Sequence, residues 1–178
     1  MKYMNKKFVR IGNIRRLAVF VTAVIVGSFL SMPAEAVTLN STQKLKLQYL
    51  IEEEKLARDI YTFLAANVTT QKFSNISKSE QTHMDQIANL LATYKVSNPT
   101  SGEAPGVFKN KTLAQLYSDL IYQGKTSTVA AFGVGVTVEK MDLSDLKSIR
   151  LIFTQSDALA ALDLLAKGSQ NHLAAFTR

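Results

Sequence analysis

The chain has 178 residues, of which 21 are basic and 14 acidic, giving a formal net charge of +7. It has no cysteine, which excludes thiolate zinc sites, iron–sulfur clusters, disulfides, thiol catalysis and a lipoprotein anchor. Without its first 36 residues the chain keeps 15 basic and 13 acidic residues, a net charge of +2, so the charge favours no nucleic-acid partner.

Residues 1–36 have the three parts of a secretory signal peptide. Six basic side chains accompany an apolar run at 17–30, and the small-residue cleavage motif Ala-Glu-Ala follows at 34–36. We predict cleavage after Ala36 and an exported, periplasmic or extracellular protein of residues 37–178 without a stable membrane anchor. The alternative is an uncleaved anchor, but the run is shorter than the ~20 residues of a spanning helix.

The remaining 142 residues suit one domain with one core. Apolar residues recur with helical spacing throughout, and no segment shows the sustained alternation of a strand, so we predict an all-α fold. In chain order, helices are expected at about 40–68, 75–97, 113–122, 126–151 and 154–176, with a long polar loop at about 96–110.

The first expected helix carries one charge in its apolar stripe. Asn40 offers an N-cap, and Glu54 lies in the stripe. Glu52 and Glu53 are expected beside the stripe or facing outward. The stripe consists of Leu47, Leu50, Glu54, Ala57, Tyr61, Leu64 and Val68.

The second expected helix places Glu80 and His83 three residues apart, on one face. Ile76, Ile87 and Leu90 continue the same stripe, which predicts that the carboxylate and the imidazole face the core. A carboxylate beside an imidazole is half of a metal-binding arrangement, although this spacing is also frequent by chance.

The last two expected helices add acids and the only other histidine. Glu139 and Asp142 lie on one stripe of the fourth, and His172 lies on the stripe of the last. Gly168 could stop the last helix early, because glycine costs roughly 1 kcal/mol relative to alanine inside a helix.

Four expected helices therefore turn possible ligands toward one core: Glu54, Glu80, His83, Glu139 and His172. Buried carboxylates are costly unless they are paired or bind metal, and two divalent cations would neutralise them. Each residue also has an ordinary alternative. A lone glutamate can reach solvent at a helix edge, and a lone histidine on an apolar face is usually a hydrogen-bonded core residue.

The order of these residues resembles the ferritin-like di-iron carboxylate proteins, which use one Glu from each of two helices and a Glu-x-x-His from each of the others. The segment 54–61 is similar to the first metal helix of rubrerythrins. The chain is also similar to an uncharacterised bacterial and archaeal ferritin-like family, and three segments carry that similarity: 52–61, 135–143 and 168–173. The resemblance implies a ferritin-like four-helix bundle with an extra short helix in the long crossover connection, and two iron ions, or manganese instead.

One residue departs from the ferritin pattern, since Ser169 stands where the second Glu-x-x-His needs its carboxylate. Asp142, one turn after Glu139, could supply the missing charge, as a second acid does at this spacing in rubrerythrins. A single-metal site and a degenerate site are the alternatives.

The resemblance implies an oxidoreductase or ferroxidase type of protein that reacts with oxygen or peroxide. Tyr61 could hydrogen-bond a ligand or the oxidant, with a core role as its alternative. Without cysteine, turnover requires an external electron donor. The competing hypothesis is a non-catalytic metal carrier or interaction module, and a homo-oligomer is compatible with either.

Overall fold

Five helices make up residues 38–178, the part of the chain that the computed structural model describes. This part contains no strand, which confirms the all-α prediction, and none of its helices has the length and apolar character needed to cross a membrane. The predicted signal peptide lies outside the described residues. The helices are α1 (Ser41–Ala65), α2 (Lys72–Thr93), α3 (Lys111–Gly124), α4 (Thr128–Arg150) and α5 (Ser156–Phe176).

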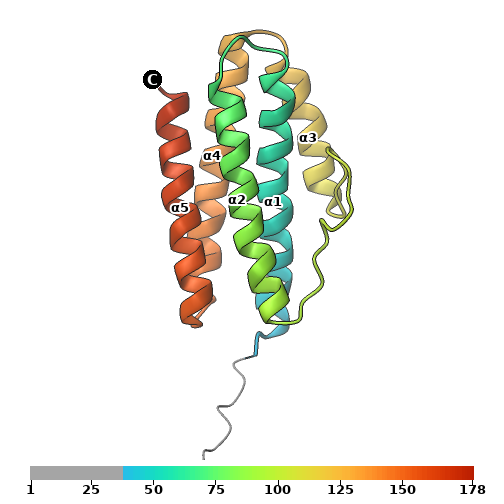
Figure 1. Cartoon of the computed structure of the whole chain (residues 1–178), viewed down its shortest axis with the longest axis vertical. Coiled ribbons are helices and arrows are strands. Elements are labelled where there is room, and N and C mark those ends of the chain that lie inside the picture. Colours follow the sequence, from blue (N-terminus) through green and yellow to red (C-terminus); the bar gives the residue numbers. More distant parts are fainter. Residues whose placement is uncertain (1–37) are drawn as a thin grey trace, which may run out of the picture. The chain divides into compact units, whose positions relative to one another are not determined.

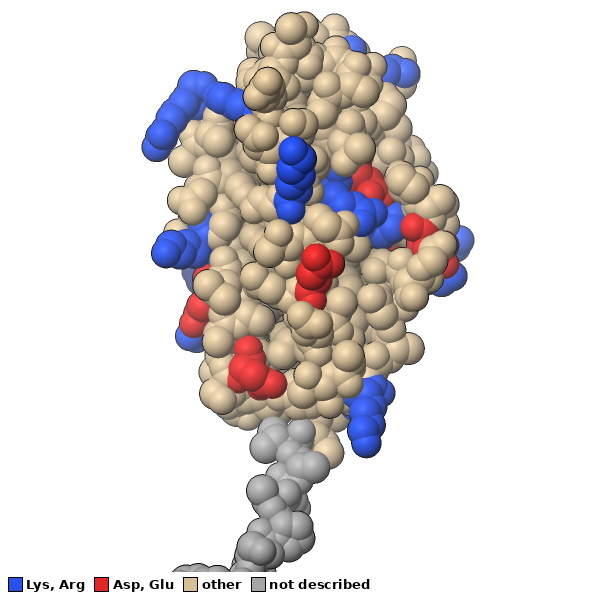
Figure 2. Space-filling model, in the orientation of Figure 1, with Lys and Arg blue, Asp and Glu red and all other residues tan. Residues whose placement is uncertain are grey.

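The four longer helices form a bundle in which α1 contacts α2 and α4, and α5 contacts the same two helices. Short links make α1 and α2 antiparallel, and likewise α4 and α5 (Figure 1). The connection after α2 runs back along the bundle and contains α3, which packs against α1 and α4. The expected short helix therefore lies in the long connection. On the face shown in Figure 2, charges of both signs are scattered among uncharged residues.

The start of α1 follows from its cap. The side chain of Asn40 accepts a hydrogen bond from the amide of Gln43 at 2.9 Å, and the Gln43 side chain accepts one from the Asn40 amide at 2.9 Å. Both bonds satisfy amides that the first helical turn leaves free. Gln43 also donates to the carbonyl of Ile152 at 2.8 Å, which holds the start of α1 against the link between α4 and α5.

The core consists of two apolar clusters with polar side chains between them. The first cluster surrounds Leu50 and Leu162, and the second surrounds Ile60 and Val134. Each long helix places two polar residues at the level between the clusters. This polar layer comprises Glu53, Glu54, Glu80, His83, Glu139, Asp142, Ser169 and His172, and all eight are buried.

The expectations for two residues, Glu52 and Glu53, are wrong. Glu52 and Glu53 are buried rather than lateral or outward, because α1 contacts α2, α3 and α4 and has several buried faces. Lys55, also on α1, is only 1 % exposed. The last helix continues through Gly168 to Phe176, in agreement with its expected range of about 154–176.

Lys55 anchors the long connection to α1. Its ammonium donates to the Asp59 carboxylate at 2.5 Å and to the carbonyl of Ala104 at 2.8 Å, and it lies 4.5 Å from the centre of the Phe108 ring. Asp59 also accepts from the amide of Gly106 at 2.9 Å. These contacts satisfy a buried charge pair that would otherwise be costly.

Replacing Lys55 with methionine should lower the free energy of unfolding by on the order of 3 kcal/mol, because it leaves Asp59 buried with fewer partners. Lys44→Met is the matched control, since Lys44 is exposed on the same helix. Urea unfolding of both variants measures the difference. An equal loss of unfolding free energy in both variants would show that the buried pair of Lys55 and Asp59 does not stabilise the fold.

Candidate metal centre

The polar layer brings together the five residues that the sequence predicted as principal ligands. Two groups of three have donor atoms that all lie within 4.8 Å of one another. We call Glu54, Glu80 and His83 the first triad, and Glu80, Glu139 and His172 the second triad. Glu80 belongs to both triads, so the two groups share a carboxylate.

The two oxygens of Glu80 point to different triads. In the first, His83 Nδ1 lies 2.8 Å from Glu80 Oε2 and 3.1 Å from Glu54 Oε2. In the second, His172 Nδ1 lies 2.8 Å from Glu80 Oε1 and 3.6 Å from Glu139 Oε1. A carboxylate placed in this way can bind one cation through each oxygen.

Several of these atoms approach closely without hydrogen-bonding one another. Glu54 Oε1, Glu80 Oε1 and His172 Nδ1 are buried and have no hydrogen-bond partner, although the last two lie 2.8 Å apart. Buried polar atoms without partners cost about 1–3 kcal/mol each. Donor atoms that lie within 4.8 Å of one another, several of them without a hydrogen-bond partner, fit a cation placed among them.

The His172 imidazole is held from the side opposite the carboxylates. His172 Nε2 lies 2.9 Å from the hydroxyl of Ser79. In a neutral ring, Nε2–H donates to Ser79 and leaves the lone pair of Nδ1 directed into the second triad. The two imidazoles stack with ring centres 5.5 Å apart. The hydrogen bond to Ser79 gives His172 the orientation that metal-binding histidines need.

Gly168 leaves the space that the His83 ring occupies. A Cβ at this position would lie 2.4 Å from His83 Nε2, whereas one at Gly133, in α4, would meet nothing within 4 Å. Gly168, the possible early end of the last helix, therefore allows α5 to lie close to the first triad.

Gly168→Ala should displace the His83 ring and weaken metal binding by about 10–100-fold, the usual effect of disturbing the groups that orient a ligand. Gly133→Ala should instead stabilise α4 by up to about 1 kcal/mol and leave metal affinity unchanged. Titration of both variants with Co²⁺ measures the affinities. Equal affinities would contradict the role of Gly168.

Tyr61 is buried beside the second triad. Its hydroxyl donates to Glu139 Oε1 at 2.6 Å, and its ring packs against Phe73 and Phe176. Burial, followed by the Glu139 charge, raises the pKa of Tyr61 well above its usual range. The geometry combines the two roles expected for Tyr61, a core residue and a hydrogen-bond donor to a candidate ligand.

Asp142 lies close to Ser169, the residue that replaces the expected carboxylate. Both Asp142 oxygens are buried without hydrogen-bond partners, and Asp142 belongs to neither triad. The Ser169 hydroxyl donates to the carbonyl of Leu165 at 2.9 Å. Burial raises the pKa of Asp142 to about 7, and Ser169 acts against this shift. The aspartate thus adds an acid near the position where serine removed one.

Charges within the layer compensate one another when no cation is considered. Burial alone would raise the pKa of Glu80, but His172 and His83 lower it to about 2. Burial would lower the histidine pKa values, yet the neighbouring carboxylates raise that of His83 to about 10 and that of His172 to about 9. Burial raises the pKa of Glu139 to about 7 and that of Glu54 well above its usual range. Without a cation, protons bound to the histidines and to the carboxyl groups therefore compensate the negative charge of the layer.

Sequence reasoning missed Glu53 as a member of the layer. It is 1 % exposed, and neither carboxylate oxygen has a hydrogen-bond partner. The signal was the run of three glutamates, because successive helical residues point about 100° apart. Glu52 faces the long connection and accepts from the amides of Lys109 and Asn110. Glu54 belongs to the first triad, and Glu53 lies near Asp142 and Asp145 of α4.

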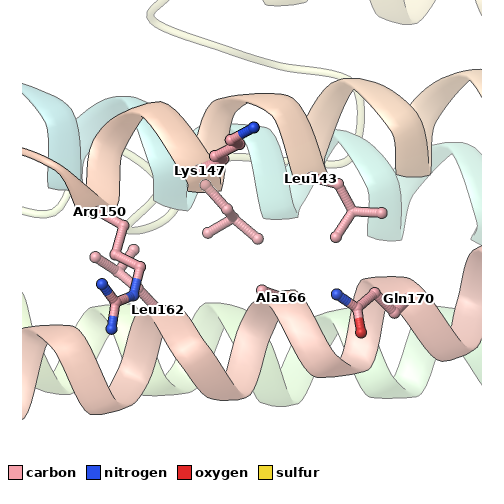
Figure 3. A pocket seen from close by; sticks show the side chains of 7 residues that line it. Leu143, Lys147, Arg150, Leu162, Ala166 and Gln170 are labelled. Carbon is pink, nitrogen blue, oxygen red and sulfur yellow. The ribbon is translucent and has the colours of Figure 1, made fainter.

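A surface groove of about 330 Å³ lies between α4 and α5, outside the polar layer (Figure 3). Leu143 and Gln170 face each other across it, and Arg150 at its edge pairs with Asp163 at 2.6 Å. None of its lining residues belongs to a triad. The groove therefore gives no direct access to the candidate ligands.

Comparisons with known proteins find similarity over all five helices. The model of an uncharacterized protein domain, DUF2202, matches residues 43–178. The uncharacterized protein MJ0754 of Methanocaldococcus jannaschii is 38% identical over 148 residues, which covers 83% of this chain and 79% of the relative. The crystal structure of the hypothetical protein MJ0754 from Methanococcus jannaschii has a TM-score of 0.77, with 38% identity and 82% of each chain covered.

Proposed function

Because the chain belongs to the uncharacterized DUF2202 domain family, we propose its function from its own site: it binds two divalent metal ions, iron or else manganese, in the polar layer. The observation that carries this proposal is the pair of triads that share Glu80. Carboxylates with one imidazole per triad form a donor set that suits iron, manganese and zinc.

The candidate ligands divide between two ions. Glu54 and His83 would hold one ion, Glu139 and His172 the other, and Glu80 would bridge them. The three glutamates give two divalent ions a net charge of +1, and Asp142 would neutralise it. In this proposal Asp142 replaces the carboxylate that Ser169 lacks. This division of ligands is supported by buried oxygens of Glu54, Glu80 and Asp142 that have no hydrogen-bond partner.

We assign the fold to the ferritin-like class as part of the same proposal. Its support is the arrangement of four long helices around an acidic layer, with a long connection between the second and third of them. Ferritin-like di-iron proteins place their ligands on the facing sides of four such helices.

The proposed activity is oxidoreductase or ferroxidase chemistry with oxygen or peroxide. A pair of bound metal ions would supply sites that bind and reduce the oxidant. Tyr61 positions Glu139 through its hydrogen bond, and Ser79 positions His172. The apolar clusters on both sides exclude bulk water, and the burial of every triad residue favours small oxidants over large substrates. An external electron donor would complete turnover.

Metal analysis tests the centre. Protein purified from cells without a histidine tag should contain close to two metal ions per chain. Less than one ion, with no change on His83→Ala, would reject both the dinuclear centre and simple metal binding. Addition of oxygen or peroxide to the iron(II) protein should change its visible spectrum if it is an oxidoreductase.

Ser169 favours a second candidate function, a non-catalytic metal carrier. A centre with fewer carboxylates than the ferritin pattern can bind metal without turning over. Two bound ions with no spectral response to oxygen or peroxide would select the carrier. A homo-oligomer remains compatible with both functions, and size-exclusion chromatography with light scattering would determine it.

We also propose that the protein works outside the cytoplasm, in the periplasm or the medium. The basic segment, apolar run and Ala-Glu-Ala motif of residues 1–36 support export, and the absence of cysteine is compatible with an oxidising compartment. N-terminal sequencing of protein from cell fractions tests this proposal. A chain that begins at Val37 would support it, and an intact N-terminus in the cytoplasm would contradict it.

A further inference from the structure

Three carboxylates at the contact of α1 and α4 have no basic partner. They belong to Glu53 on α1 and to Asp142 and Asp145 on α4. Within the described part of the chain, no ion pair includes any of them. Burying charges in this way is costly unless protons or cations compensate them.

One of these carboxylates reaches the surface, and the other two are buried. Asp145 is only partly buried, and one of its oxygens accepts from the Tyr49 hydroxyl at 2.9 Å. Glu53 and Asp142 are buried, and none of their four oxygens has a hydrogen-bond partner. Burial, then the charges of Asp142 and Asp145, raise the pKa of Glu53 well above its usual range.

The helical positions arrange these groups in a line. Tyr49 and Glu53 are one turn apart on α1, Asp142 and Asp145 are nearly one turn apart on α4, and the two helices are in contact. At the inner end, Asp142 is the charged neighbour that acts most strongly on Glu54 of the first triad. The carboxylates therefore lead from the surface to the proposed centre.

We infer that Glu53 and Asp145 form a binding station for a hydrated divalent cation, from which the ion passes Asp142 into the centre. That the ion ends in the centre rests on the proposed function, whereas the station formed by Glu53 and Asp145 is a separate binding site. All its donors are oxygens, which suit Mg²⁺, Mn²⁺ and other hard cations, whereas each triad adds an imidazole. Among the described residues only the triads bring three donor atoms within 4.8 Å, so the looser station suits an ion that keeps its water.

The rate of metal loading tests the passage. Metal-free protein is mixed with Co²⁺, and its visible absorption reports ions that reach the imidazoles. Glu53→Gln and Asp145→Asn should each slow filling by at least about tenfold, the lower range for electrostatic focusing, while the final number of ions at the imidazoles stays at two. Glu52→Gln is the control, because Glu52 is an adjacent buried carboxylate already bound by two backbone amides. A Glu53→Gln variant that fills at the unaltered rate would overturn the passage.

A second measurement tests the station without the centre. A variant with Glu80→Gln, His83→Ala and His172→Ala lacks the shared carboxylate and both imidazoles of the centre. It should still bind one Mn²⁺ per chain, seen by electron paramagnetic resonance as loss of the free-ion signal, and adding Glu53→Gln should abolish that binding. Mn²⁺ binding that persists after Glu53→Gln is added, or that is absent before it is added, would overturn the station. A wild-type protein that binds one Mn²⁺ through Glu53 but no Co²⁺ at the imidazoles would support the station and reject the proposed function.

Discussion

Glu80→Gln should remove both metal ions from the centre at once. Glu80 contributes one oxygen to each triad, so its loss reduces both to two candidate ligands. Glu54→Gln and Glu139→Gln each affect one triad and should each leave about one ion per chain. Metal analysis of the purified variants measures the ratio directly.

Loss of the ions should also lower stability. An ion present at 1,000 times its dissociation constant stabilises the folded state by about 4 kcal/mol, so Glu80→Gln should lose about twice as much as Glu54→Gln under metal-saturated conditions. Glu52→Gln should retain both ions, since its partners are backbone amides of the long connection. Two ions remaining in Glu80→Gln would contradict a shared carboxylate.

The pH dependence of stability should reverse sign when metal binds. In the metal-free protein, burial raises the pKa values of Glu139 and Asp142 to about 7, and nearby carboxylates outweigh burial to raise those of His83 and His172 to about 10 and about 9. All four groups hold protons more tightly in the folded than in the unfolded chain. Their stabilising contribution is complete below their unfolded pKa values and is lost as pH rises through the folded ones.

The free energy of unfolding of the metal-free protein should therefore fall by a few kcal/mol between about pH 5 and about pH 8, since each pKa unit corresponds to about 1.4 kcal/mol. Glu80, with its pKa lowered to about 2, acts in the opposite sense only below this range. With metal, the ligands are already deprotonated in the folded chain, so stability should rise over the same interval. Urea unfolding with and without chelator measures both slopes. A metal-free stability that increases from pH 5 to pH 8 would contradict the assigned proton occupancy.

Helical periodicity predicted which side chains face the core. Glu54, Glu80, His83, Glu139 and His172 all lie in the polar layer because each occupies an apolar stripe with the spacing of a helix. Periodicity alone also placed Ser169 and Asp142 on inward stripes, and both are buried.

Other features depend on neighbours that periodicity does not reveal. A single stripe assumes one buried face, whereas α1 contacts three helices, so Glu53 and Lys55 are buried on other faces. Glycine propensity left Gly168 as a possible early end of the last helix, and it could not reveal that the absent Cβ accommodates the His83 ring. The division of the Glu80 oxygens between two imidazoles depends on side-chain rotamers, which the sequence does not specify.

The two apolar clusters have a consequence for how the chain opens. Each cluster draws on all four long helices, and the layer between them contains ionisable groups in place of close-packed hydrocarbon. Without metal, one end of the bundle can fray while the other stays packed, so amides near the two ends should exchange hydrogen at different rates. Bound ions would join all four helices at mid-height and make the ends open together. The layer would then determine whether this chain behaves as one cooperative unit or as two.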